Sequence, residues 1–287
     1  AASGDEIVDL QGGFLAPAFM DGHAHPLFGG REAQGPLVNG LQTVAEMVAE
    51  VKRFADSNPN APWIIGGAYE AAVVGGGDFL ASWLDAVVSD RPVVLQAVDH
   101  HTIWVNSKAL EIAGISAATP DPDGGSIARN PDGTARGTLR EPSAMDLIMK
   151  HAPERTVDED VAAIAWASDR YLESGVTAAT DAWVEPGMAE AYIAADKSGA
   201  LKIDMDLFFL AQPGTWRERV SYFAKLREEI KSLGAGSKLA PGDTLGAGGS
   251  GPVPPDSRAS QPAAAAATKI DPATSETVMM LANGRVS

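Results

Sequence analysis

The sequence of 287 residues predicts an α/β fold in which strands of a parallel sheet alternate with helices. Three segments show the capping-box pattern of a helix start, Thr-x-x-Glu before apolar residues at helical spacing, and they begin at Thr43, Thr156 and Thr215. Short apolar runs rich in β-formers occupy residues 63–65, 92–95, 176–180 and 203–210. Such alternation favours parallel architecture, and residues 175–233 show the order strand, helix, strand, helix most clearly.

Composition limits the classes of partner. Hydrophobic residues make up 45% of the chain, which is enough for the core of one large or two smaller domains. The formal net charge of −16 repels phosphate backbones and anionic headgroups, so we expect no nucleic-acid partner, although ordinary solubility also explains this charge. No run of about 18 apolar residues predicts a membrane span. The chain reads as soluble, and the sequence leaves open whether it is cytoplasmic or exported.

A pair of histidines is the first candidate for chemistry. Residues 14–26 read as an apolar strand that ends in His23 and His25, and positions i and i+2 of a strand point to the same side. Active sites of parallel barrels lie at the carboxyl ends of their strands. The chain has no cysteine, so a metal must be held by histidines and carboxylates. A His-x-His pattern alone fits a surface or loop role equally well.

Ordered motifs then point to a family. Residues 9–26 resemble the first barrel strand of the amidohydrolase superfamily, which ends in an aspartate, any residue and His-x-His. Further motifs resemble the YtcJ-like branch, which includes N-substituted formamide deformylases; they lie at residues 63–67, 84–85, 91–93, 99–110, 124–129, 132–133 and 137–141. Residues 175–177 and 201–210 look like the next barrel strands. The resemblance covers about residues 7–235.

This resemblance implies a (β/α)8 TIM-barrel type of fold, incomplete in this chain, with a small β-sandwich built from the chain ends. The expected division is residues 1–20 and 276–287 for the β-domain, 21–235 for the partial barrel with an insertion at about 30–160, and 236–275 for a linker rich in Gly, Pro and Ala. The implied activity is hydrolysis of a carbon–nitrogen bond in a small non-peptide amide or N-acyl compound, through a water activated by a divalent metal. Zinc is the first candidate for that metal.

The resemblance also implies a set of site residues. It makes His23, His25 and Glu141 the metal-site candidates, and it places substrate-binding residues in the insertion: Asp99, His101, Trp104 and Asn106. From the residues alone, a structural, hydrogen-bonded His101 is an equal interpretation, and Glu141 before Pro142 also fits a carboxylate that stabilises a helix N-terminus. Asp181 follows the strand at 176–180 and fits either a pocket contact or an ordinary loop aspartate.

The sequence departs from the family pattern after residue 233. A lysine-bearing strand is expected there, and the Gly/Pro/Ala-rich segment follows instead. His151 matches neither of the later family histidines, so the remaining ligands and the catalytic aspartate have no counterpart and the catalytic residues stay unknown. The alternative function is therefore a catalytically incomplete half-barrel, which needs a second chain or a second copy or serves in binding.

The last residues resemble the first strand of the family rather than a later one. Residues 278–286 form an apolar run that contains Asn-Gly, a strong hairpin signal. We expect residues 278–281 to pair with residues 7–10, because a lone two-stranded ribbon is marginal in water. A permuted or spliced chain and a native terminal extension both explain this order.

Overall fold

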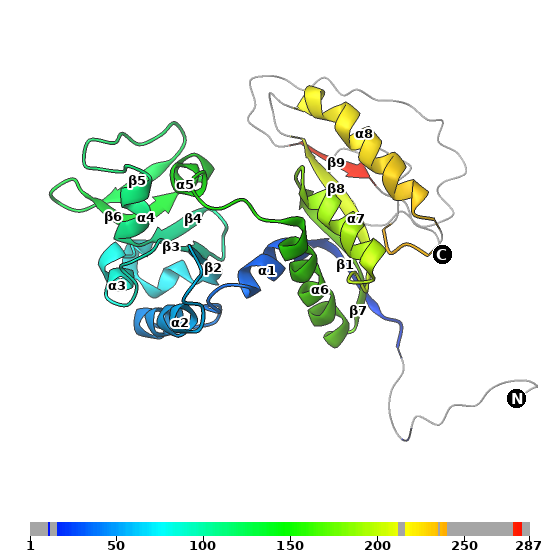
Figure 1. Ribbon diagram of the computed structural model, residues 1–287, viewed down its shortest axis with the longest axis horizontal. Coiled ribbons are helices and arrows are strands. Elements are labelled where there is room, and N and C mark those ends of the chain that lie inside the picture. The colour runs from blue at the N-terminus through cyan, green and yellow to red at the C-terminus, as the bar shows by residue number, and fades with distance from the viewer. Residues whose placement is uncertain (1–10, 12–15, 212–215, 235, 240–277, 283–287) are drawn as a thin grey trace, which may run out of the picture. The chain divides into compact units, whose positions relative to one another are not determined.

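The computed structural model describes residues 11, 16–211, 216–234, 236–239 and 278–282 (Figure 1). The chain divides into two compact units, and each is described by itself. Unit 1 comprises Ala1–His25 with Ser168–Ser287, and unit 2 comprises Pro26–Ala167. The predicted insertion at residues 30–160 falls inside unit 2. No helix in the described ranges is both long enough and apolar enough to cross a membrane.

Unit 1 is built on a sheet of four strands in the order β1-β7-β8-β9. Their bounds are Phe19–Ala24 for β1, Val176–Val184 for β7, Asp204–Ala211 for β8 and Val278–Ala282 for β9. The first three strands are parallel, and β9 runs antiparallel to β8. Helix α7 (Met188–Ser198) links β7 to β8, and α8 (Trp216–Ser232) follows β8. The predicted order of strand, helix, strand, helix is confirmed.

The two helices of unit 1 use their apolar faces differently. Most of α7 is buried, whereas α8 buries one stripe at helical spacing that consists of Phe223, Leu226 and Ile230. The ring of Phe223 stacks on Phe209 of β8 with centroids 4.9 Å apart and an interplanar angle of 8°. This stripe fixes α8 against the strand that precedes it in the chain.

Unit 2 contains a five-stranded sheet in the order β2-β3-β4-β6-β5. The strands are Ile64–Tyr69 (β2), Val93–Ala97 (β3), Thr102–Val105 (β4), Ser126–Arg129 (β5) and Ala135–Arg140 (β6). Only β2 and β3 are parallel; the other pairs are antiparallel, so the expectation of parallel strands is wrong here. The reason is connection length, because four residues between β3 and β4 cannot form the crossover of a dozen or more residues that parallel strands need.

Helices α1 to α5 belong to unit 2, and α6 begins in unit 2 and ends in unit 1. Their bounds are Pro26–Ala33 (α1), Val44–Ser57 (α2), Ala81–Asp85 (α3), Ser107–Ile112 (α4), Pro142–Met149 (α5) and Val157–Glu173 (α6), with short 3-10 turns at η1 (Ala71–Val73) and η2 (Gly75–Gly77). The capping boxes at Thr43 and Thr156 are confirmed by hydrogen bonds to Glu46 and Glu159. Thr215 lies outside the described residues, and the helix predicted after it is α8.

Helices α1 and α6 approach closely at their buried faces. A Cβ atom on Gly30 would lie 2.2 Å from the carbonyl oxygen of Ala163, so only glycine fits there. Arg31 donates two hydrogen bonds, of 2.9 and 2.6 Å, to the carboxylate of Asp160, and Arg155 donates a third of 2.6 Å. Burial raises the pKa of Asp160, but the hydrogen bonds from these two arginines outweigh it and leave the pKa below its usual value.

The core of unit 2 lies on both faces of the sheet. In β3, Val93 and Leu95 join one apolar cluster and Val94 joins the other, as alternation along a strand requires. Trp104 of β4 lies in the first cluster with no exposed surface, and its Nε1 donates to the carbonyl of Leu80 at 2.9 Å. Trp104 was expected in a substrate pocket; the structure makes it part of the core.

Asn106 is also a structural residue. It is fully buried, its Oδ1 accepts from the amides of Val93 and Ala109, and its Nδ2 donates to the carbonyls of Val88 and Arg91. An asparagine side chain has two donor hydrogens and two acceptor lone pairs, so these four bonds use its whole capacity. The structure thus gives Asn106 a structural role, and its contact with substrate stays a prediction that nothing tests.

Two predictions concern the chain ends. Strand β9 pairs with β8 at the edge of the unit 1 sheet, whereas residues 7–10, its predicted partner, lie outside the described residues. Most of the predicted linker at 236–275 also lies outside them. The described strands form two open sheets, with β1 and β9 at the two edges of one, so a closed barrel is not formed by the part of the chain that the structure describes.

We predict that Asn106→Ala lowers the free energy of unfolding by about 3 kcal/mol, because it removes a helix cap and leaves buried amides and carbonyls without partners. Urea unfolding followed by circular dichroism measures this loss. Asn58→Ala is the control, since the exposed Asn58 side chain donates one bond, to Phe54, and its removal should cost less than about 1 kcal/mol. Equal losses in the two variants would contradict the structural role of Asn106.

Candidate metal centre and its surroundings

His23 and His25 lie at the carboxyl end of β1, on the same side of the chain. Their ring centroids are 5.5 Å apart, with an interplanar angle of 78°. His23 is exposed, and the side chain of His25 is 33% exposed. This separation lets a nitrogen of each ring reach one ion at about 2.0–2.1 Å, the distance of zinc–imidazole bonds.

A buried carboxylate lies beside His25. Asp181 belongs to β7, where its Cα pairs in register with Ala24, so it is neither exposed nor in a loop. Oδ1 of Asp181 is 3.6 Å from Nδ1 of His25 and accepts a 3.0 Å hydrogen bond from the backbone amide of Trp183. Oδ2 accepts a 2.6 Å hydrogen bond from the hydroxyl of Tyr192 on α7. Of the two interpretations left open for Asp181, the loop aspartate is wrong.

A second carboxylate supports the backbone of the histidine pair. Oδ1 of Asp21 accepts a 3.2 Å hydrogen bond from the amide of His23, and Oδ2 accepts a 3.3 Å bond from the hydroxyl of Tyr171. Burial, and then the charge and hydrogen bond of Asp21, raise the pKa of Tyr171 to about 12. Sequence reasoning missed Tyr171 and Tyr192, because no local pattern marks either. Pairing of β1 with β7 brings Tyr171 to Asp21, and packing of α7 brings Tyr192 to Asp181.

His23 and His25 are of a residue type that binds divalent metals, but two histidines make only part of a metal site. Neutral imidazoles suit zinc and similar divalent ions, whereas the ordinary zinc site has at least three protein ligands. Across the described ranges, no three His, Asp or Glu side chains lie close enough together to hold an ion. The described residues therefore offer two candidate ligands, His23 and His25, and a complete site would require further groups.

Three other predicted site residues come together in unit 2. Asp99 accepts a 2.8 Å hydrogen bond from the amide of His101, and Nδ1 of His101 lies 3.0 Å from Oε2 of Glu141. The side chains of His101 and Glu141 are 62% and 49% exposed. Glu141 is the N-cap residue of α5, and its side chain forms no hydrogen bond to the helix, so only its charge is left to stabilise the helix N-terminus. Its place in the metal site stays a prediction.

A neighbouring pair was not predicted from sequence. Nε2 of His100 lies 3.5 Å from Oε1 of Glu32 on α1. Burial raises the pKa of Glu32 to about 7, so desolvation outweighs the attraction of the imidazole. Nothing in the local sequence distinguishes Glu32 from a solvated helix residue, because its burial comes from packing against Gly67 of β2.

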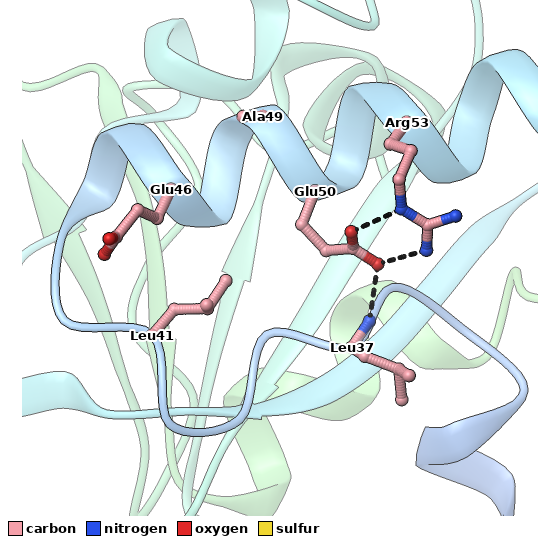
Figure 2. Close-up of a pocket in the computed structure, with 6 residues that line it drawn as sticks. All are labelled: Leu37, Leu41, Glu46, Ala49, Glu50 and Arg53. Carbon is pink, nitrogen blue, oxygen red and sulfur yellow. Dashed lines mark hydrogen bonds and ion pairs between the residues drawn. The ribbon is translucent and has the colours of Figure 1, made fainter.

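Figure 2 shows a groove between α2 and the segment before it, lined by Leu37, Leu41, Glu46, Ala49, Glu50 and Arg53. Glu50 accepts two 2.7 Å hydrogen bonds from Arg53 and one of 3.1 Å from the amide of Leu37. The bond from Arg53 is the main cause of the lowered pKa of Glu50. The groove contains none of the predicted site residues. Glu50 and Arg53 are paired with each other, and Glu46 accepts hydrogen bonds from Thr43 and Gln42.

We predict that Glu32→Gln stabilises the protein at high pH. The pKa of folded Glu32 lies near 7, above its usual 4.5, so its favourable contribution is complete below pH 4.5 and is lost as pH rises through 7. Glutamine cannot ionise, so the variant should gain up to about 3 kcal/mol relative to the parent between pH 4.5 and pH 8.

Denaturant unfolding at a series of pH values measures this gain. Glu141→Gln is the matched control. It removes a half-exposed carboxylate from the ion pair of Glu141 with His101, and this should change stability little. A difference between Glu32→Gln and the parent that does not vary with pH would overturn the assignment.

Known proteins resemble this chain over most of its length. The putative amidohydrolase YtcJ of Bacillus subtilis is 34% identical over 183 residues, which is 63% of this chain and 32% of that protein. The N-substituted formamide deformylase of Arthrobacter pascens is 30% identical over 208 residues, covering 70% of this chain and 38% of the deformylase. Protein LONG AFTER FAR-RED 3 of Arabidopsis thaliana is 33% identical over 214 residues, 70% of this chain and 36% of its own. The chain thus spans about a third of the length of these relatives, from 32% to 38%.

A solved structure supports the fold. An uncharacterized metal-dependent hydrolase from Pyrococcus horikoshii superimposes with a TM-score of 0.53 at 24% identity, over 83% of this chain and 44% of that one. The sequence model of the amidohydrolase family matches residues 6–237, close to the 7–235 expected from the motifs. The His-x-His strand, the following parallel strands and this match over most of the chain agree, and the chain belongs to the amidohydrolase family.

Proposed function

We propose that this chain provides part of a metal-dependent hydrolase that cleaves a carbon–nitrogen bond in a small non-peptide amide, with an N-acyl or N-formyl amine as the substrate class. His23 and His25 are two ligands of its divalent ion, with zinc as the first candidate. The observation that carries this proposal is the convergence of two imidazoles, 5.5 Å apart, at the carboxyl end of a parallel strand.

The chemistry divides between the ion and the chain. A divalent ion held here would supply a Lewis acid that lowers the pKa of a water toward neutrality and polarises the substrate carbonyl. The chain's own residues fix the two imidazoles: Asp21 holds the amide of His23, and Asp181 faces the ring of His25. The residue that moves the proton is not assigned among the described residues.

Similarity to the formamide deformylase supports the substrate class, and the net charge of −16 argues against nucleic acid as substrate. Because the chain spans about a third of its curated relatives, the activity of the whole protein is part of the proposal.

The second candidate is a catalytically incomplete half-barrel that needs a partner chain or a second copy, or serves in binding. It is favoured by the open unit 1 sheet and by the lack of a third ligand near the histidine pair within the described ranges. Metal binding by the chain alone, without turnover of any N-formyl or N-acyl amine, would favour this candidate over the first.

We predict that the double variant His23→Ala with His25→Ala loses its bound divalent metal and keeps most of its fold, because these ligands lie at a strand end and not in the packed core. Elemental analysis together with far-UV circular dichroism measures both properties. His151→Ala is the control, since His151 is an exposed histidine in a turn of unit 2. Full metal content in the double variant would refute the site, and its complete unfolding would make the site structural.

A further inference from the structure

We propose that Asp181 and Tyr192 position the imidazole of His25 for the metal, with Nδ1 of the ring toward Asp181 and Nε2 toward the ion. Neither residue is proposed as a ligand. The inference rests on the proposed function for its metal, but the positioning itself is a property of the metal-free chain.

The first step is the fixed orientation of the carboxylate. Asp181 and Tyr192 have no exposed surface, and each oxygen of Asp181 accepts from a different donor. Oδ2 takes the Tyr192 hydroxyl at 2.6 Å, and Oδ1 takes the amide of Trp183 at 3.0 Å. Because one donor is backbone and the other is carried by a buried helix, rotation of the carboxylate breaks at least one buried hydrogen bond.

The second step is the effect of this carboxylate on His25. A neutral imidazole carries one N–H and one lone pair, so the position of its proton decides which nitrogen can bind a metal. Oδ1 of Asp181 is 3.6 Å from Nδ1, longer than a hydrogen bond, but a buried negative charge at this distance favours the proton on Nδ1. The lone pair then lies on Nε2. Ligand histidines of metalloproteins are oriented in this way by carboxylates behind them.

The third step concerns Tyr192. It lies among apolar buried residues of α7, so burial of its hydroxyl is unfavourable unless that hydroxyl is hydrogen-bonded. Phenylalanine would fill nearly the same space and would leave Oδ2 of Asp181 without this donor. Tyr192→Phe therefore removes the positioning contact while it keeps the packing.

A matched control exists on the neighbouring helix. Tyr222 of α8 donates its hydroxyl to the carboxylate of Glu190, which, like Tyr192, belongs to α7. Tyr222→Phe removes the same kind of bond from the same helix without touching the bonds of Asp181. A change seen in Tyr192→Phe and absent in Tyr222→Phe is thus not a general effect of losing a tyrosine hydroxyl bonded near α7.

The experiment uses the full chain and cobalt(II) as a probe whose absorption spectrum reports ligand geometry. We expect Tyr192→Phe to bind cobalt about 10-fold more weakly and with an altered spectrum, and Tyr222→Phe to match the parent. In the metal-free parent, nitrogen NMR shifts of the His25 ring should show the proton on Nδ1, and Asp181→Asn should lose this preference. Unchanged affinity and spectrum in Tyr192→Phe, or a parent proton on Nε2, overturns the proposal.

Failure of the proposed function gives a different result. A parent chain that binds no cobalt defeats the metal site, and the NMR comparison of parent with Asp181→Asn then decides the positioning by itself. If Tyr192→Phe or Asp181→Asn does not fold, the proton position in the parent, which needs no substitution, supports or overturns the proposal.

Discussion

Parallel pairing of β1 with β7 joins two strands that are separated in sequence by the whole of unit 2. Carboxyl ends of parallel strands meet at one edge, and the register of Ala24 with Asp181 places His25 beside a buried carboxylate. A slip of one residue would turn each side chain of β1 to the opposite face. The histidine pair, the bond of Tyr171 to Asp21 and the contact of Asp181 with His25 therefore all depend on this register.

Three carboxylates that are wholly or partly buried differ in the donors around them. Asp160 is surrounded by the guanidinium groups of Arg31 and Arg155, which lower its pKa despite burial. Glu32 has an imidazole 3.5 Å away, and burial raises its pKa to about 7. Asp181 has no exposed surface, and it receives one hydroxyl and one amide hydrogen bond, which offset the desolvation of its oxygens.

Local sequence patterns predicted the elements well, because capping at Thr43 and Thr156 and the apolar runs of β7 and β8 are short-range signals. The family and the histidine strand also followed from ordered motifs. Burial is not a local property, and this is why Trp104 and Asn106 were expected in a pocket although both lie in the interior. No sequence pattern marks Tyr192, since its hydroxyl meets Asp181 only when α7 packs on β7.

In the sequence, unit 2 lies between β1 and β7, and this order has a consequence during synthesis. Residues 26–167 are contiguous, so unit 2 contains all its own strands before β7 is made. About 150 residues follow β1 before its partner emerges, which takes on the order of 10–30 s at usual rates of translation. Phe19 and Met20, 67% and 49% exposed even in the folded chain, belong to a strand without a neighbour throughout that interval. Until β7 is made, β1 is thus an unpaired strand that presents its backbone N–H and C=O groups to other chains.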